Sequence, residues 1–224
     1  MRMESNKMET TRQITNGSVT TQPPVLTSIN SLTVYAATKT ESAPILQNVH
    51  VTRSEDHLIV TATNRYVAVQ AVYDNVEFTD WSEDHSMLIP ADILKQAAAV
   101  SKANRGLAMV TFAAHEREGY SHNNAYVSVG DTQFTYDQAT GSYPPVGKLF
   151  PDTEPNGAAT LGINPKWLVA LSKIVVPEVR PAKDVPWKLE FWSEDGAKPK
   201  PMQASMIGNG YDIRVLIQPN VIVR

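Results

Sequence analysis

The sequence predicts an α+β fold in which one pattern recurs: an apolar run, a helix start, and then antiparallel strands. Met87–Ile89 leads into a helix that starts at Pro90, and Leu161–Ile163 leads in the same way into a helix at Asn164–Pro165. The proline-rich joint Tyr143–Pro151 lies between the two copies. Because each proline fixes its own φ and favours an extended residue before it, we expect this joint to be a stiff connector.

Composition sets the broad class. A chain of 224 residues with 42% hydrophobic content can bury a core of one or two domains. It has no cysteine, which removes disulfides, thiolate nucleophiles and cysteine-based zinc sites. The net charge of -3 argues against a protein that coats nucleic acid indiscriminately, although a local basic face is compatible with it. No apolar run approaches the roughly 20 residues of a membrane helix, and we expect a cytoplasmic protein.

Residues 1–27 are rich in Thr, Ser, Asn and Gln and poor in large apolar residues, which predicts a disordered N-terminal tail. The first unit is then expected to open with a helix from Ser31, its N-cap, to about Ser42. Strands are predicted to follow at Ile45–Thr52, His57–Ala62 and Tyr66–Tyr73.

The second unit combines a strand at Ser86–Ile89 with the helix from Pro90, where a first-turn proline is tolerated. Its strands are predicted at Leu107–Ala113, Ala125–Val129 and Gln133–Tyr136. In the third unit Asn164 is the expected N-cap of a helix. The apolar stripe of that helix is predicted to contain Trp167, Leu168, Leu171 and Ile174. Strands follow at Trp187–Trp192, Met202–Met206 and Asp212–Ile217. The expected organisation is one complete domain of two units at 28–152 and a half-domain at 153–224.

Three segments, in this order, resemble the bacterial β-clamp form of the sliding clamps that hold replicative polymerases on DNA. Thr61–Val69 is similar to the family's Ala-Thr-Asp-Gly-His-Arg-Leu-Ala strand and turn. Tyr143–Pro151 is similar to the aromatic-proline segment that closes a middle domain, and Val215–Asn220 to a final strand that ends in Met-Pro-Met. The resemblance covers residues 28 to 224 and implies the DNA-clamp fold, with helices on one face of curved sheets.

The chain also departs from this pattern. The turn at Asn64–Arg65 is one residue shorter than in the family, and Gln218 and Asn220 replace the terminal methionines. The chain has three half-domain units, half as many as the family. It is therefore similar to a middle domain followed by the second half of the last one, as in a compact phage or mobile-element version.

A sliding clamp needs a positive face that follows phosphates without reading bases. Lys95 and Lys102 are seven residues apart on the second-unit helix, and Lys166 and Lys173 repeat this spacing on the third-unit helix. Lysine on a helix is often only solvated surface. The resemblance implies instead that these helices line the bore of a clamp, with Arg105 added just beyond the second-unit helix.

The resemblance also implies a groove that captures short peptides from polymerases and clamp loaders. Transferred position by position, it contains Thr63, Asn64, Arg65 and Val67 from the first segment, Pro144, Lys148 and Leu149 from the second, and Leu216, Gln218 and Asn220 from the third. Ordinary strand and connector packing is the alternative explanation for each. With Gln218 and Asn220 in place of methionine, an adaptable apolar lining, the groove is expected to be more polar.

No catalytic or metal-binding pattern is present. The five histidines show no metal-ligand spacing, and there is no phosphate-binding glycine loop, so we expect no metal and no cofactor. The acidic cluster around Trp81, with Asp80, Glu83, Asp84 and His85, is more typical of a solvated loop than of acid–base groups. A small hydrolase that uses this loop is the enzyme alternative, and we expect that the protein is not an enzyme.

The sequence thus favours a homo-oligomeric ring that encircles duplex DNA without sequence preference and tethers a polymerase as its processivity factor. If the ring keeps the family's roughly twelve units, closure takes about four copies of the chain, a tetramer. The alternative is a clamp-fold interaction protein that modulates a host clamp or polymerase without encircling DNA.

Overall fold

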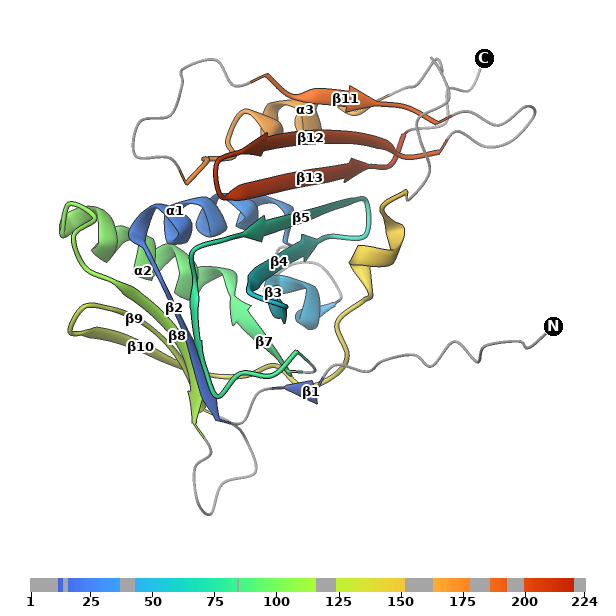
Figure 1. The fold of residues 1–224 in the computed structure, drawn as a ribbon. Coiled ribbons are helices and arrows are strands. Elements are labelled where there is room, and N and C mark those ends of the chain that lie inside the picture. The colour runs from blue at the N-terminus through green and yellow to red at the C-terminus, as the bar shows by residue number, and fades with distance from the viewer. Residues whose placement is uncertain are drawn as a thin grey trace.

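A computed structural model describes residues 12–13, 16–36, 43–83, 85–115, 124–151, 163–177, 186–192 and 200–219. Figure 1 shows two β-sheets, with helices α1 (Pro23–Leu32) and α2 (Ala91–Ala103) lying between them in this view. The two helices pack against each other, and α2 also contacts strands of both sheets. The short helix α3 (Pro165–Leu171) lies beside the last strands. This mixed architecture, with few helices and almost wholly antiparallel sheets, confirms the predicted α+β class.

The larger sheet has eight strands in the order β1-β7-β3-β4-β5-β13-β12-β11. Every neighbouring pair in it is antiparallel except β1 with β7. Its strands are β1 (Arg12–Gln13), β3 (Asn48–Ser54), β4 (His57–Thr63), β5 (Val67–Tyr73), β7 (His85–Pro90), β11 (Lys188–Glu190), β12 (Met202–Gly208) and β13 (Tyr211–Ile217).

The smaller sheet has five strands in the order β10-β9-β8-β2-β6, all antiparallel. Its strands are β2 (Gly17–Thr21), β6 (Glu77–Thr79), β8 (Val110–His115), β9 (Asn124–Val129) and β10 (Thr132–Asp137). Three short 3-10 helices complete the described elements: η1 (Thr33–Tyr35), η2 (Pro44–Gln47) and η3 (Val146–Leu149).

Three repeated units account for most of these elements. The first unit contains β2, α1, β3, β4 and β5; the second contains β7, α2, β8, β9 and β10; the third contains α3, β11, β12 and β13. The first two units exchange their opening strands, because β2 pairs with β8 and β7 pairs with β3. This exchange and the α1–α2 contact interlock the two units into one domain.

The third unit joins the first through the edges of their sheets. Strand β13 pairs with β5 over seven residue pairs, from Tyr211 opposite Tyr73 to Ile217 opposite Val67. Each of these strands is the last strand of its unit, so the junction joins last strand to last strand. The larger sheet is therefore continuous across two units that lie far apart in the sequence (Figure 1).

The fourth residue of each helix is a leucine, and it is buried in two of the three helices. Leu26 and Leu94 are each the fourth residue of their helix, and both are 0% exposed. Leu168 holds the same position in α3 but is 44% exposed, so its predicted place in a buried stripe is wrong. The structure shows the reason: among the described residues α3 has no second helix against it of the kind that α1 and α2 provide for each other.

The predicted disordered tail is wrong for residues 17–27. Strand β2 and most of α1 lie in this stretch, and Val19, Leu26 and Ile29 are fully buried. Pro23 and Pro24 stand at the first turn of α1, where proline is tolerated because the first amides have no partner within the helix. The first unit thus starts before residue 28, and residues 1–11 lie outside the described part of the chain.

The expected helix from Ser31 to Ser42 is also wrong. Helix α1 ends at Leu32 and continues as the 3-10 turn Thr33–Tyr35, in a stretch whose β-branched residues disfavour a longer helix. The second-unit helix begins at Ala91, with Pro90 as its N-cap. A boundary near residue 152 stays a prediction, because residues 152–162 are outside the described ranges.

None of the helices in the described ranges is long and apolar enough to cross a membrane. No group of three or more His, Asp or Glu side chains within those ranges is arranged to hold a metal ion.

Candidate partner groove and basic helix face

The tight turn between β4 and β5 is held by its own side chains. Asn64 accepts hydrogen bonds through Oδ1 from the backbone amides of Tyr66 and Val67, both at 3.1 Å. Thr63 donates through Oγ1 to the carbonyl of Val67 at 2.8 Å and accepts from the amide of Arg65 at 3.2 Å. Arg65 has a φ of 76°, in the left-handed region. The result is a rigid turn that presents Arg65 and Tyr66 to solvent, Tyr66 being 63% exposed.

The proline-rich connector covers the junction between β5 and β13. Val146 and Phe150 are buried against Ala68 of β5 and Leu216 of β13, in a small cluster separate from the main core. Gly147 lies close to the sheet, since a Cβ at this position would stand 3.1 Å from Nε2 of Gln70. The connector thus packs as the stiff segment that its prolines predicted.

An aromatic pair anchors the start of the connector. The rings of Tyr143 and His50 stack with centroids 4.8 Å apart and planes 19° apart. The Tyr143 hydroxyl donates to the carbonyl of Asn48 at 3.4 Å. Burial lowers the pKa of His50 to about 4 and raises the pKa of Tyr143, so both rings are neutral at pH 7. A stacked pair of neutral rings holds the connector against β3.

Polar contacts cross the same junction. Arg214 of β13 donates through Nη2 to Oε1 of Gln70 in β5 at 3.0 Å. Its guanidinium carbon lies 5.5 Å from the centroid of the Phe150 ring, a cation–π distance. The amide of Gln218 donates to the carbonyl of Tyr66 at 3.2 Å. Turn, connector and final strand are therefore tied into one surface.

The structure brings together the described residues of the three segments predicted to form a groove. Arg65, Pro144, Lys148, Leu149 and Gln218 are exposed on this surface, and Leu149 is 58% exposed. Thr63, Asn64, Val67 and Leu216 are buried beneath it, where they hold the turn and the junction. Asn220 lies outside the described residues. The exposed set can contact a partner directly, whereas the buried set supports it.

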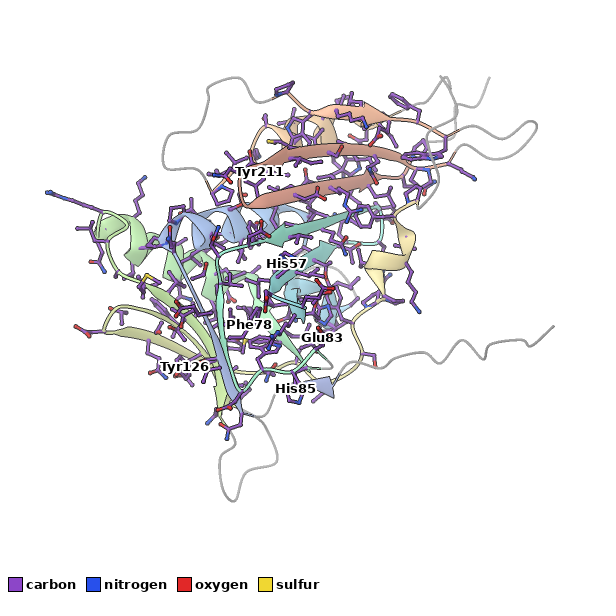
Figure 2. The ribbon with its side chains drawn as sticks, in the orientation of Figure 1. His57, Phe78, Glu83, His85, Tyr126 and Tyr211 are labelled. Carbon is purple, nitrogen blue, oxygen red and sulfur yellow. The ribbon has the colours of Figure 1, made fainter. Side chains whose placement is uncertain are left out.

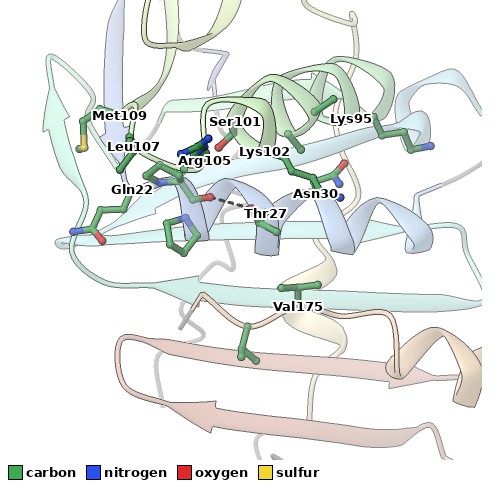
Figure 3. A pocket seen from close by; sticks show the side chains of 16 residues that line it. Gln22, Thr27, Asn30, Lys95, Ser101, Lys102, Arg105, Leu107, Met109 and Val175 are labelled. Atoms are coloured by element: carbon green, nitrogen blue, oxygen red, sulfur yellow. Dashed lines mark hydrogen bonds between the residues drawn. The ribbon is translucent and has the colours of Figure 1, made fainter. Parts of the chain in front are cut away.

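A second surface is a hollow of about 1090 Å³ beside α1 and α2 (Figure 3). Lys95, Lys102 and Arg105 line it from the α2 side, and all three side chains are exposed. Among the described residues, no ion pair joins any of these cations to a carboxylate. Arg105 adopts a φ of 55° at the end of α2, where the amide of Gly106 closes the helix on the carbonyl of Ser101 at 2.9 Å. Three unpaired positive groups thus face one hollow.

Sequence reasoning missed the residues that line the hollow from α1. Gln22, Pro23, Thr27 and Asn30 belong to this side. The first three were expected to be tail, and Asn30 lay just before the expected helix. The available signal was Pro23–Pro24, the helix-start pattern that was recognised at Pro165. Val175 also lines the hollow, and its amide donates to Oγ of Ser31 at 3.0 Å. The third unit therefore reaches this face as well.

The two lysines of the third unit are not equivalent to those of α2. Lys166 lies in α3, behind the predicted N-cap, where Asn164 Oδ1 accepts from its amide at 3.0 Å. The Lys166 ammonium group lies 4.2 Å from the Trp167 ring centroid. Lys173 lies past the helix, which ends at Leu171, so its predicted place on α3 is wrong. A polar turn at Ser172, whose hydroxyl donates to the carbonyl of Val169 at 2.7 Å, ends the helix there.

The acidic loop considered for catalysis has a structural role. Trp81 is buried, its indole N–H donates to the carbonyl of His85 at 3.3 Å, and its ring meets Phe78 edge-on. Glu83 accepts from the amide of Glu55 at 2.8 Å. Figure 2 shows Phe78, Glu83 and His85 around the β6–β7 turn. These contacts hold the turn together; Asp84 lies outside the described residues.

Repeated units, exchanged opening strands and a sheet that continues from unit to unit agree with the clamp-type fold that the sequence predicted. A scan against protein-family models finds no match. Among curated proteins, the beta sliding clamp of Staphylococcus aureus is 27% identical over 129 residues, which is 57% of this chain and 31% of that protein.

Solved structures agree with this sequence match. The DNA polymerase III subunit beta of Borrelia burgdorferi has a TM-score of 0.71 at 14% identity, covering 95% of this chain and 65% of that one. The DNA polymerase sliding clamp of Pseudomonas aeruginosa has a TM-score of 0.69 at 11% identity, covering 98% of this chain and 70% of that one.

The chain is similar in sequence to bacterial beta sliding clamps over 129 residues, and it shares the fold of solved clamp structures over most of its length. Its sequence match spans less than a third of the length of the curated relatives. The similarity to beta sliding clamps agrees with the prediction that the chain is not an enzyme.

Proposed function

We propose that the chain is a subunit of a ring-shaped sliding clamp that encircles duplex DNA and tethers a replicative polymerase as its processivity factor. The main observation behind the proposal is that two units join edge to edge through β5 and β13. Exposed cations on helix α2 add to it. Edge-to-edge joining can be continued from unit to unit, which is what a closed ring requires.

The basic hollow supplies the contact to DNA. Lys95, Lys102 and Arg105 are exposed, unpaired within the described residues and grouped beside two helices, so they can neutralise phosphates without reading bases. Each phosphate contact contributes close to one unit to the slope of log K against log salt. Lys166 and Lys173 add two exposed charges from the third unit. Contacts of this kind hold DNA loosely enough for the ring to slide.

The partner groove supplies the tether. Its exposed rim combines Arg65 and Lys148 with the apolar Leu149, a mixture that suits a short peptide with apolar and acidic side chains. Gln218, exposed at the end of β13, makes this rim more polar than a methionine would. We propose that polymerase and clamp-loader peptides bind here, with a preference shifted towards polar residues.

The test is retention on DNA of defined topology. The protein, loaded onto nicked circular plasmid, is expected to stay bound in high salt and to leave when one restriction cut linearises the plasmid. A double charge reversal, Lys95→Glu with Lys102→Glu, is expected to lower the amount bound at low salt, before the salt is raised, at least tenfold, whereas the single reversal Lys188→Glu on β11 is expected to leave that amount unchanged. Equal release from circles and linear DNA would contradict encirclement.

The number of copies is tested separately. A ring of about four copies predicts a mass four times that of the chain by light scattering at micromolar concentration. A chain that stays monomeric there and still inhibits or stimulates another clamp would favour the second candidate, a clamp-fold modulator that does not encircle DNA.

A further inference from the structure

The core of the third unit is open on one side. Leu168 is the fourth residue of α3 and is 44% exposed, whereas Leu26 and Leu94, the fourth residues of α1 and α2, are fully buried. The next residue, Val169, is 56% exposed, and Val175 beyond the helix is 41% exposed. We call the side chains of Leu168, Val169 and Val175 the α3 patch. Three aliphatic side chains are thus left partly in water where the other helices bury theirs.

The sheet of the third unit shows the same gap. Leu189 of β11 opposes Ala204 of β12, so it lies on the face of the sheet that carries the main core, yet it is 46% exposed. Its counterpart in the first unit is Val51 of β3, because each lies two strands away from the fifth residue of its unit's last strand. Val51 is fully buried, and its row of residues continues into β7 of the second unit. In the third unit the row stops at β11, which ends the larger sheet (Figure 1).

In the complete domain, each unit closes the core of the other. Helices α1 and α2 pack against each other, β2 pairs with β8, and β7 pairs with β3. These contacts are reciprocal, so an approximate two-fold axis relates the two units. The helices run antiparallel across it: Pro23 starts α1, and a Cβ at Gly106, just beyond the end of α2, would lie 3.7 Å from the Cβ of Pro23. A unit of this kind is complementary to a second unit like itself.

We propose that the third units of two copies of this chain pack face to face about a two-fold axis, α3 against α3, and complete one domain between them. The occupant of the α3 patch is the same patch of a second copy, because the surface is apolar and the contact that closes the other two units joins unit to unit. Two copies joined in this way hold six units in three domains. The proposal goes beyond the clamp function, since the contact does not require that the assembly encloses DNA.

The internal helix pair indicates which residue lies near the axis. Pro23 is position 1 of α1 and Gly106 is position 16 counted from the start of α2, so facing positions in this pair add up to about 17. Position 8 therefore lies close to the axis. Counted from Pro165, position 8 of the third unit is Ser172, an exposed small residue directly after α3. The Ser172 side chains of two copies should therefore lie within the roughly 8–10 Å that separates packed helix axes.

The absence of native cysteine allows a direct test by cross-linking. In the Ser172→Cys variant, a short bismaleimide is expected to join two chains at micromolar protein concentration. Ile207→Cys is the matched control in the same unit: Ile207 is 74% exposed and follows the core residue Met206 in β12, so it lies on the opposite face of the sheet. The yield of dimer is expected to be at least tenfold higher at position 172. Equal yields at the two positions would overturn the proposal.

A charge placed on the open core tests the same contact without cysteine. Leu168→Glu and Leu189→Glu each set a carboxylate against the apolar surface of the second copy, and each is expected to halve the mass measured by light scattering. The matched variant Ile207→Glu is expected to keep the wild-type mass. Because both leucines are partly exposed in the single chain, the circular dichroism spectrum should stay that of the wild type. A mass unchanged by both leucine variants, or lowered as much by Ile207→Glu, would sink the proposal.

These outcomes separate the interface from the function. If wild-type protein is retained on circular plasmid but Leu168→Glu and Leu189→Glu keep the wild-type mass, the α3 contact fails and the clamp function stands. If Ser172→Cys cross-links but circular and linear plasmids release the protein equally, the contact stands and encirclement fails. The Lys95→Glu, Lys102→Glu variant is expected to weaken DNA binding at low salt and to leave the cross-link intact.

Discussion

The three helices of the repeat allow one substitution to be compared in three settings. Leu26, Leu94 and Leu168 are each the fourth residue of their helix, yet the first two are fully buried and Leu168 is 44% exposed. Replacing each leucine by alanine removes the same atoms. The loss in free energy of unfolding should therefore differ between the three variants only because different fractions of the three side chains are buried.

The structure sets the expected magnitudes. A fully buried leucine loses its transfer free energy and leaves a cavity, so Leu26→Ala and Leu94→Ala should each lower the free energy of unfolding by about 3–4 kcal/mol. Leu168 loses only part of its transfer free energy and leaves no closed cavity. Leu168→Ala should therefore cost about 1 kcal/mol or less in the monomer.

Urea unfolding followed by far-ultraviolet circular dichroism measures these costs, at a protein concentration low enough to keep the chain monomeric. Leu94→Met is the control for a volume-conserving change and should cost less than about 1.5 kcal/mol. A cost for Leu168→Ala equal to that of Leu94→Ala at the lowest concentration would refute the reasoning. A cost that rises with protein concentration would show that a second molecule covers α3.

Three further predictions concern the groove. Burial lowers the pKa of His50 in the folded chain below its unfolded value. The free energy of unfolding should therefore be highest above about pH 6.5 and fall by on the order of 2–3 kcal/mol towards pH 4. Unfolding titrations of His50→Asn at the same pH values should show a smaller fall. Asn64→Ala removes the acceptor of two turn amides and should cost about 1–2 kcal/mol by urea unfolding, whereas Asn64→Asp, which keeps an acceptor, should cost less than half as much. Phe150→Ala should cost about 3 kcal/mol and release the connector, seen as faster trypsin cleavage after Lys148; an unchanged cleavage rate would contradict its anchoring role.

The sequence predicted those elements whose local chemistry is unambiguous. Strands on either side of a polar turn, such as β12 and β13 around Asn209–Gly210, follow from alternation and turn residues. Helix α3 follows from Asn164 and Pro165, which act together as cap and first turn. Helix α1 carries the same kind of start at Pro23–Pro24, but the polar residues before it outweighed that signal. Local composition misled there because β2 and α1 gain their stability from the second unit rather than from each other.

Long-range pairing was predictable only in part. The order of the three family-like segments predicted that they lie together, and in the structure Ala68, Phe150 and Leu216, one from each segment, pack in one cluster. Nothing in local spacing shows that β13 pairs with β5 at a sequence separation of 144, as at Gln70 opposite Arg214, because strand pairing depends on edges that only the folded unit creates. The buried roles of Thr63 and Asn64 were equally hidden, since a turn that binds a partner and a turn that holds itself use the same residues.

The two candidate surfaces depend on different contacts, so each can be altered without the other. The groove is built on the β5–β13 junction and the connector that covers it, through Phe150 and Leu216. The basic hollow is built mainly on α1 and α2, which pack against each other, and α2 also packs against β9 and β10 of the smaller sheet. Among the described residues of the third unit, only Val175 and Val176 line the hollow. A change confined to the connector should therefore reduce peptide binding while leaving the phosphate contacts of α2 in place, and charge reversal on α2 should do the opposite.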